Sequence, residues 1–273
     1  MGRLAQTLGV RKIMSAPFHT TGFTAPEHRA IERFLTFRTI PLSYEQNGRS
    51  FVQGTGSFYR TGEDFFIVTA AHVLNGINPG LLGVPDRPFG NVSIWNLEDI
   101  RVYHPKNTDD FDVAIIRLLN PNFIERVAKQ WQCVNESEVV QDSEDVYKYL
   151  IAGYPSETVK DLEGVLTPAP MLQLFTEEYK DRLEAPVPEY DLLLRYKRTG
   201  KDIKGNERST PALQGVSGAL VYAQCNTDAG IWSPESIFRP VGVQVSMKHG
   251  EYVRVKRWAL IRNLIEVVRE QGI

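Results

Sequence analysis

The sequence predicts an all-β fold, either a barrel or a sandwich, with a helix at its C-terminal end. Many short runs of β-branched and aromatic residues are separated by turn residues, which is typical of antiparallel strands. Apolar residues at helical spacing are clear only near the two ends of the chain. The 273 residues suffice for one large domain or two small ones.

Residues 1–38 are expected to form a polar leader that contains a short helix. Thr24 fits a helix N-cap, and Pro26 then lies in the first turn, where its fixed backbone angle is tolerated. Ile31 and Phe34 have the spacing of one helical face. We expect this helix to pack on the outside of the main body.

The strands are expected between residues 39 and 255. Residues 65–69 (FFIVT) are apolar and β-branched, which predicts a buried strand. Residues 51–60 precede it as a strand broken by glycines, with a turn at 61–64. Further strands are predicted at residues 92–95, 112–118, 148–153, 190–196, 218–223 and 240–246.

The segment 156–211 is long and less regular than the rest. Residues 177–183 are expected to form a helical turn. Residues 195–208 are rich in Lys and Arg, which favours a surface loop. Because this loop lies just before Ser217, a role in shaping a substrate cleft is the alternative.

The C-terminal residues 256–271 predict an amphipathic helix docked on the body. The apolar residues recur at helical spacing. They are Trp258, Ile261, Leu264, Ile265 and Val268.

Composition narrows the class of partner. The net charge is −2, so bulk electrostatics predict no nucleic-acid partner. No stretch approaches the roughly 20 apolar residues of a membrane span, and no membrane partner is expected. The start of the sequence has no apolar run of signal-peptide length, so the expected location is cytoplasmic.

The two cysteines, Cys133 and Cys225, allow at most one disulfide. Neither belongs to a CxxC pair, which argues against a zinc site. The sequence predicts no metal and no organic cofactor.

Three segments carry residues suited to acyl transfer, which needs a nucleophile, a base and a group that orients the base. His72 is the histidine that directly follows a strand of buried type. Asp112 begins an apolar strand, where a carboxylate needs donors such as an imidazole N–H. Ser217 lies between Gly215 and Gly218, which permit a tight turn with exposed N–H groups. Each segment taken alone also fits a purely structural role.

Together the three segments resemble the trypsin-like (chymotrypsin-fold) serine peptidases. That family carries TAAH, DIAL-type and GDSGG-type segments in this order, and this chain has TAAH at 69–72, DVAI at 112–115 and GVSGA at 215–219. The resemblance extends over residues 40–255 and implies two packed antiparallel β-barrels. It divides the chain into a leader (1–38), an N-terminal barrel (39–140), a C-terminal barrel (141–255) and a C-terminal helix (256–273).

The resemblance implies a serine endopeptidase that acts on a protein or peptide substrate through an acyl-enzyme. Ser217 would attack the scissile carbonyl, His72 would take its proton, and Asp112 would hold the imidazole tautomer. The backbone N–H groups of Gly215 and Ser217 would form the oxyanion hole.

The resemblance also assigns substrate-binding residues. Ser246 and Met247 would line the cleft, and Ser246 would also hydrogen-bond the catalytic acid. Gly250 would close the primary pocket, with Pro211 and Ala212 near its floor. Because no acid stands there, we expect a small or apolar substrate side chain rather than Lys or Arg.

Three positions depart from the secreted members of the family. Val73 and Leu213 replace usual cysteines, which fits an intracellular relative. Val216 replaces the aspartate that pairs with a new N-terminus after zymogen cleavage, so activation by that route is not expected. The IAGYP segment at 151–155 resembles a disulfide-poor bacterial-type branch, which includes regulated proteases that process one protein partner.

Two other functions remain open from the sequence. A catalytically silent homologue could use the fold to bind a protein partner, although such a module has no need of all three catalytic residue types. An esterase or another acyl hydrolase is the other alternative. The α/β-hydrolase family orders its residues as serine, acid and histidine, whereas the serine comes last here.

Overall fold

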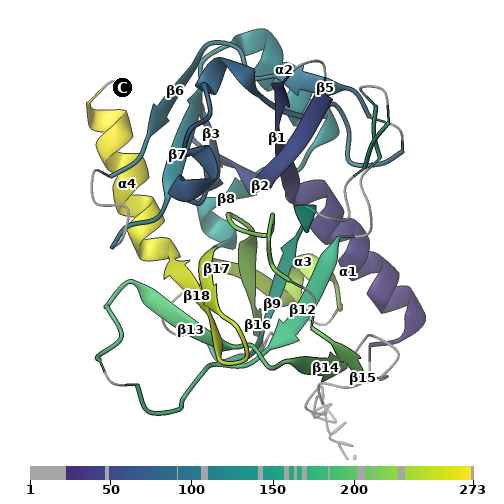
Figure 1. The fold of residues 1–273 in the computed structure, drawn as a ribbon, viewed down its shortest axis with the longest axis vertical. Coiled ribbons are helices and arrows are strands. Elements are labelled where there is room, and N and C mark those ends of the chain that lie inside the picture. The colour runs from purple at the N-terminus through teal and green to yellow at the C-terminus, as the bar shows by residue number, and fades with distance from the viewer. Residues whose placement is uncertain are drawn as a thin grey trace, which may run out of the picture.

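The structure, a computed structural model, describes residues 23–46, 49–90, 92–105, 110–140, 144–156, 160–162, 165–167, 171–183, 185–201, 207–210, 212–226 and 231–271. In this part of the chain, two curled antiparallel sheets form two half-barrels, one above the other in Figure 1. A C-terminal helix follows the last strand of the second half-barrel and runs alongside the first. The predicted all-β fold of two packed barrels with a C-terminal helix is therefore confirmed.

The first sheet has the strand order β5-β4-β1-β2-β3-β7-β6 over the described residues, and β8 pairs with β2. All of these pairs are antiparallel except that of β8 with β2. The strands are β1 (Ile40–Gln46), β2 (Arg49–Thr61), β3 (Asp64–Thr69), β4 (Leu82–Pro85), β5 (Ile94–Asn96), β6 (Ile100–Tyr103), β7 (Ala114–Leu118) and β8 (Val134–Asn135).

The second sheet has the order β12-β9-β16-β17-β18-β13. Its strands are β9 (Val146–Gly153), β12 (Leu172–Thr176), β13 (Asp191–Arg195), β16 (Leu220–Cys225), β17 (Phe238–Lys248) and β18 (Tyr252–Arg257). Two small hairpins accompany it, β10 (Lys160–Leu162) with β11 (Val165–Thr167) and β14 (Thr199–Lys201) with β15 (Glu207–Ser209).

The described chain also contains the helices α1 (Ala25–Arg38), α2 (Pro121–Gln130), α3 (Pro234–Ile237) and α4 (Trp258–Glu270). In Figure 1, α1 and α4 lie on opposite sides of the two half-barrels. The predicted C-terminal helix is thus confirmed as α4. The helix α2 was not predicted, although Asn120 accepts hydrogen bonds from the N–H groups of Asn122 and Phe123 and so caps its start.

Each strand predicted from the sequence overlaps an observed strand. The differences are in the boundaries: the expected strand at 112–118 begins at Ala114, and that at 218–223 begins at Leu220. The residues in front of each strand form turns instead. These two turns hold Asp112 and Ser217.

The N-terminal helix begins as the sequence indicates but contributes more to the core than expected. Thr24 is its N-cap, and the Thr24 N–H donates to the Glu27 carboxylate at 2.6 Å. Ile31 and Phe34 are buried, and the Phe34 ring centroid lies 5.5 Å from that of Tyr222 in the second sheet. The helix therefore packs against the outside of the two sheets as expected, and its apolar face becomes part of the large core.

The predicted helical turn at 177–183 is wrong. Glu178 pairs with Leu194 of β13, and the Tyr179 N–H donates to the Leu193 carbonyl at 2.8 Å. The edge of β13 would otherwise carry unpaired backbone groups, and this segment satisfies them. The extended segment after β12 thereby joins the two edge strands of the second sheet.

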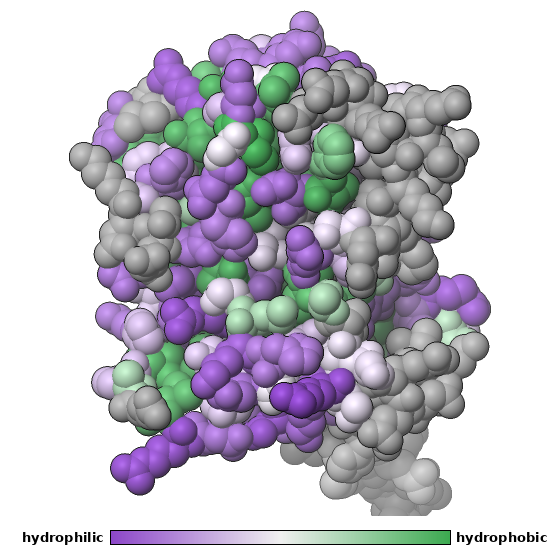
Figure 2. All heavy atoms as spheres, viewed as in Figure 1, coloured by the Kyte–Doolittle hydropathy of each residue, from purple (hydrophilic) through white to green (hydrophobic). Residues whose placement is uncertain are grey.

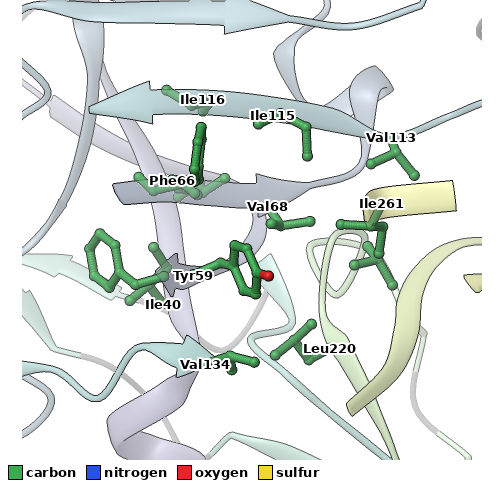
Figure 3. Packing of buried hydrophobic residues seen from close by; sticks show 14 of the residues in the cluster. Ile40, Tyr59, Phe66, Val68, Val113, Ile115, Ile116, Val134, Leu220 and Ile261 are labelled. Carbon is green, nitrogen blue, oxygen red and sulfur yellow. The ribbon is translucent and has the colours of Figure 1, made fainter. Parts of the chain in front are cut away.

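The core is divided by the two faces of the strands in the second sheet. Along β16, Leu220 and Tyr222 point to the large core shared with the first sheet, whereas Val221 and Ala223 point into a smaller core. Both faces of β16 are buried, which explains its nearly continuous apolar sequence. Residues from both sheets and from α4 meet in the large core, among them Val68, Val113, Leu220 and Ile261 (Figure 3).

The surface gives little indication of a partner. Hydrophilic residues cover much of the described part of the face in Figure 2, and hydrophobic ones appear between them in separate places. Single exposed apolar side chains of this kind are normal on soluble domains. No helix in the described ranges is long and apolar enough to cross a bilayer.

The helix α4 is docked by apolar packing and by polar contacts of Arg262 with Glu136 and of Arg269 with Asp64. Trp258 and Ile261 are almost fully buried, and the Trp258 ring centroid lies 5.2 Å from that of Tyr59 on β2. Glu136 accepts hydrogen bonds from the Tyr59 hydroxyl at 2.7 Å and from Arg262 Nε at 2.6 Å. Burial and this bond to Glu136 raise the pKa of Tyr59.

Replacing Ile261 by alanine should lower the free energy of unfolding by about 2–5 kcal/mol, because it leaves a cavity at a fully buried site. The matched control is Asn263→Ala on the exposed face of the same helix, which should change it by less than about 0.5 kcal/mol. Urea unfolding followed by tryptophan fluorescence measures both. Equal effects of the two substitutions would contradict the docking of α4.

Candidate active site

The pairing of β3 with β7 brings His72 and Asp112 to one edge of the first sheet. In this antiparallel pair Thr69, the last residue of β3, lies opposite Ala114, the first residue of β7. His72 follows Thr69 by three positions, and Asp112 precedes Ala114 by two. The chain therefore leaves β3 and enters β7 at the same place, and the two side chains meet there.

The carboxylate of Asp112 binds His72 through both of its oxygens. The His72 backbone N–H donates to Asp112 Oδ1 at 2.9 Å, and His72 Nδ1 lies 2.7 Å from Oδ2. Because a carboxylate only accepts hydrogen bonds, Nδ1 carries the proton and Nε2 of a neutral ring is free to accept one. The His72 side chain is 41% exposed and the Asp112 side chain 17%, so the base is reachable and the acid is sheltered.

The loop that carries Asp112 is fixed from the second sheet. A tight turn surrounds Asp112, with the Val113 N–H donating to the Phe111 carbonyl. The Asp110 carbonyl accepts a hydrogen bond from Lys256 Nζ at 2.5 Å. Because Lys256 belongs to β18, this bond crosses from one half-barrel to the other.

Lys256 is itself held by a buried ion pair. Its Nζ lies 2.6 Å from Asp191 Oδ1, and the two side chains are 2% and 0% exposed. Arg254 Nε approaches the second Asp191 oxygen at 3.5 Å. A charge pair at such depth contributes little net stability, but loss of one partner leaves the other charge buried without compensation. Sequence reasoning missed this pair, because Asp191 and Lys256 lie far apart in the sequence, on β13 and β18, and leave no local pattern.

Lys256→Met should therefore lower the free energy of unfolding by about 3–5 kcal/mol, since it leaves the Asp191 carboxylate buried without its lysine partner. The double variant with Asp191→Leu should recover much of that loss. Lys248→Met is the control on the same hairpin, and we expect little change because the Lys248 side chain is 60% exposed. Urea unfolding of the variants measures these effects, and a stable single variant would contradict the assignment.

The turn that carries Ser217 needs glycine at two positions. Gly215 and Gly218 have φ angles of +87° and +90°, which favour glycine. A Cβ on Gly218 would lie 2.0 Å from the Thr55 carbonyl oxygen, and one on Gly215 would lie 2.4 Å from the Ser156 nitrogen. The bare backbone at Gly218 lets the turn press against β2 next to the end of β3, which leads to His72.

Backbone hydrogen bonds hold the Ser217 turn in place from both sheets. The Ser217 carbonyl accepts from the Thr55 N–H of β2 at 2.8 Å, and the Gly218 N–H donates to the Gln244 carbonyl of β17 at 2.8 Å. Val216 is fully buried in the smaller core. Ser217 itself is partly exposed.

Two backbone N–H groups of this turn are unused within the described chain. The amides of Gly215 and Ser217 donate no hydrogen bond to another described residue, whereas those of Val216, Gly218 and Ala219 all do. Unused donors on either side of a buried residue can bind a negatively charged oxygen. The arrangement can therefore act as the predicted oxyanion hole.

The structure brings the serine turn and the histidine segment onto the same part of the fold without joining their side chains. Among the described residues, the Ser217 hydroxyl makes no hydrogen bond to His72. Catalytic hydrogen bonds of this kind are often loose in the absence of substrate.

The predicted bond between Ser246 and Asp112 is not formed. The Ser246 side chain is exposed, and both Asp112 oxygens are used by His72. A register shift in β17 between Gln244 and Ser246 changes the direction in which the side chains point at this position. The bulge could not be read from the sequence.

The other residues expected to bind substrate lie near the β17–β18 turn, just before the Ser217 turn or outside the described chain. Met247 is 39% exposed, as a residue lining a cleft would be, and Gly250 has a φ of +82° in the β17–β18 turn. The Arg198 side chain covers Gly250, since a Cβ there would lie 3.2 Å from Arg198 Nε. Ala212 is exposed, and Pro211 lies outside the described residues.

Val73, which the resemblance places at a usual cysteine position, packs against Gly54. A Cβ on Gly54 would lie 2.5 Å from a methyl carbon of Val73. The two cysteines of this chain lie elsewhere and are both free. Burial raises the pKa of Cys133 to about 11 and that of Cys225 to about 12, so neither is an activated thiolate.

Iodoacetamide at pH 8 should label Cys133 in the native protein about 100-fold more slowly than in the unfolded protein. The pKa rises from 9.0 to about 11, which lowers the thiolate fraction by that factor. Labelling followed by mass spectrometry measures the rate, with the same reaction in denaturant as the control. Native labelling at the unfolded rate would contradict the burial of this thiol.

Comparisons with known proteins identify no family for this chain. No family model matches the chain, and no curated protein matches it. A similar solved structure comes from a study of how aromatic interactions drive coupled folding and binding of the intrinsically disordered Sesbania mosaic virus VPg protein. It is 14% identical with a TM-score of 0.48, over 84% of this chain and 89% of that one. A similarity this low carries no argument about function.

Proposed function

We propose that this protein is a serine endopeptidase of the chymotrypsin-like type. The observation that carries the proposal is the His72–Asp112 pair, with 2.7 Å between Nδ1 and Oδ2, at the edge of the sheet against which the Ser217 turn packs. The two unused N–H groups of that turn supply the remaining requirement, an oxyanion site. The proposal also rests on the order of the three segments along the chain.

The arrangement suits a two-step acyl transfer. Ser217 Oγ forms a bond to the scissile carbonyl carbon while its proton moves to His72 Nε2, and the carbonyl oxygen becomes an oxyanion. The N–H groups of Gly215 and Ser217 stabilise that charge, and Asp112 stabilises the imidazolium. The imidazolium then gives its proton to the leaving amine as the peptide C–N bond breaks. Water then adds to the acyl carbon while His72 takes its proton, and the acid leaves as the bond to Ser217 breaks and Oγ regains that proton.

The proposed enzyme needs no cleavage of its N-terminus for activity. In secreted relatives an aspartate at the position of Val216 forms an ion pair that orders the oxyanion turn, and valine cannot do this. Val216 is instead packed among apolar side chains of the second sheet, including Ile151 and Ala219. Apolar packing can hold the turn without an ion pair.

A silent homologue that binds a protein partner is the second candidate. The observation that favours it is the absence of a hydrogen bond between the Ser217 hydroxyl and His72 in the described chain. A regulated, disulfide-poor protease acting on one partner protein lies between the two candidates. Such an enzyme would close this contact only when its substrate binds.

Exposure to a fluorophosphonate tests the proposal. The wild-type protein should gain the mass of one phosphonyl group, because an activated serine displaces fluoride from the reagent. Ser217→Ala should gain none, and His72→Ala should react slower by a factor on the order of 10⁴. Intact-mass spectrometry gives the adduct, and circular dichroism checks that each variant is folded.

The outcome separates the candidates. A folded wild-type protein that stays unlabelled would contradict the enzyme proposal and favour the binding homologue. Labelled protein that cleaves small esters but leaves an unfolded protein substrate intact would indicate another acyl hydrolase. Cleavage of the unfolded protein that is lost in Ser217→Ala supports the endopeptidase.

A further inference from the structure

We infer that Thr55 is a positioning residue that locks the oxyanion turn in its binding conformation, and this inference rests on the proposed function. Thr55 lies on β2 in the first half-barrel and is fully buried. It makes four hydrogen bonds, two through its backbone and two through its hydroxyl. No substrate-facing role is available to a side chain at this depth.

Two of these bonds hold carbonyl groups of the serine turn. The Thr55 N–H donates to the Ser217 carbonyl at 2.8 Å, and the Thr55 hydroxyl donates to the Gly215 carbonyl at 2.8 Å. The turn is thus clamped on both sides of the buried Val216. Because a single residue makes both bonds, residues 215 and 217 cannot move independently of β2.

The hydroxyl of Thr55 also accepts a hydrogen bond from the Tyr154 N–H at 3.1 Å. Two residues further on, the Ser156 N–H donates to the Gln214 carbonyl at 2.9 Å. The segment that follows β9 is therefore bound to Thr55 through Tyr154. Through Ser156 the same segment binds the carbonyl group of the Gln214–Gly215 peptide. In this way the hydroxyl acts on the turn both directly and through a neighbouring segment.

These contacts decide where the two free N–H groups point. In a trans peptide the C=O and the N–H project in opposite directions. The Gln214 carbonyl is tied to Ser156, so the Gly215 N–H must point away from it. The Val216 carbonyl accepts from the Ala219 N–H at 2.9 Å, which orients the Ser217 N–H in the same manner.

Thr55 also connects the serine turn to the histidine. Its carbonyl accepts a hydrogen bond from the Thr69 hydroxyl at 2.7 Å. Thr69 is the last residue of β3, three positions before His72. One buried residue thus links the proposed nucleophile, oxyanion site and base. Val216 holds the turn by apolar packing but cannot form an ion pair. The Thr55 hydroxyl adds a directional hydrogen bond to this turn.

Three threonine variants test the inference. Thr55→Val removes the hydroxyl at nearly constant shape and leaves the Gly215 carbonyl and the Tyr154 N–H unpaired. Thr55→Ser keeps the hydroxyl. The matched control is Thr39→Val, because the Thr39 hydroxyl is also fully buried but has no hydrogen-bond partner among the described residues.

The first readout is the second-order rate of fluorophosphonate labelling under conditions where each variant is folded. We expect Thr55→Val to react at least about 10-fold more slowly, since loss of one oxyanion donor costs a factor of about 10²–10³. Thr55→Ser should stay within about 3-fold of wild type, and Thr39→Val should match it. A general loss of packing would affect the two valine variants alike, and recovery by serine would not be expected.

The second readout does not require catalysis. Hydrogen exchange measured by mass spectrometry should show faster exchange of the Val216 and Ala219 amides in Thr55→Val, because the bonds of the turn open more often. An unlabelled wild type would refute the proposed function, while exchange would still decide the role of Thr55. If Thr55→Val is labelled at the wild-type rate and its Val216 and Ala219 amides exchange at the wild-type rate, the inference is overturned.

Discussion

Every group proposed for the chemistry depends on the seam between the two half-barrels. His72 and Asp112 belong to the first sheet, whereas Ser217 belongs to a turn that leads into the second. A displacement of about 1 Å between reacting groups can cost a factor of about 100 in rate. The contacts across the seam must therefore fix position as well as provide stability.

Apolar packing supplies the stability of this seam, and a few buried polar contacts supply its register. The large core includes residues of both sheets, such as Phe58 and Tyr222, together with α1 and α4. Such packing tolerates small shifts, whereas a hydrogen bond does not. Thr55 and Lys256 each make a directional bond across the seam, one to the serine turn and one to the loop of the acid.

Much of this candidate site could be predicted from the sequence, because the three segments proposed for catalysis combine local signals with a fixed order. The apolar run of β3, the acid in front of β7 and the glycines around Ser217 are each visible within a few residues. The exposed position of Ser246 and the buried pair of Lys256 with Asp191 were not predicted. The first depends on a β-bulge and the second on a contact between strands that are distant in sequence, and neither leaves a local pattern.

Under the proposed function, two positions that differ from secreted trypsin-like peptidases are consistent with each other. Val73, where those peptidases carry a cysteine, packs closely against Gly54, and Val216, where they carry an aspartate, is buried in an apolar core. Both changes remove dependence on an event outside the fold, oxidation in one case and proteolysis in the other. What remains is a turn ordered by its own neighbours, above all by Thr55, so control of such an enzyme would have to act on access to the cleft or on the distance between Ser217 and His72.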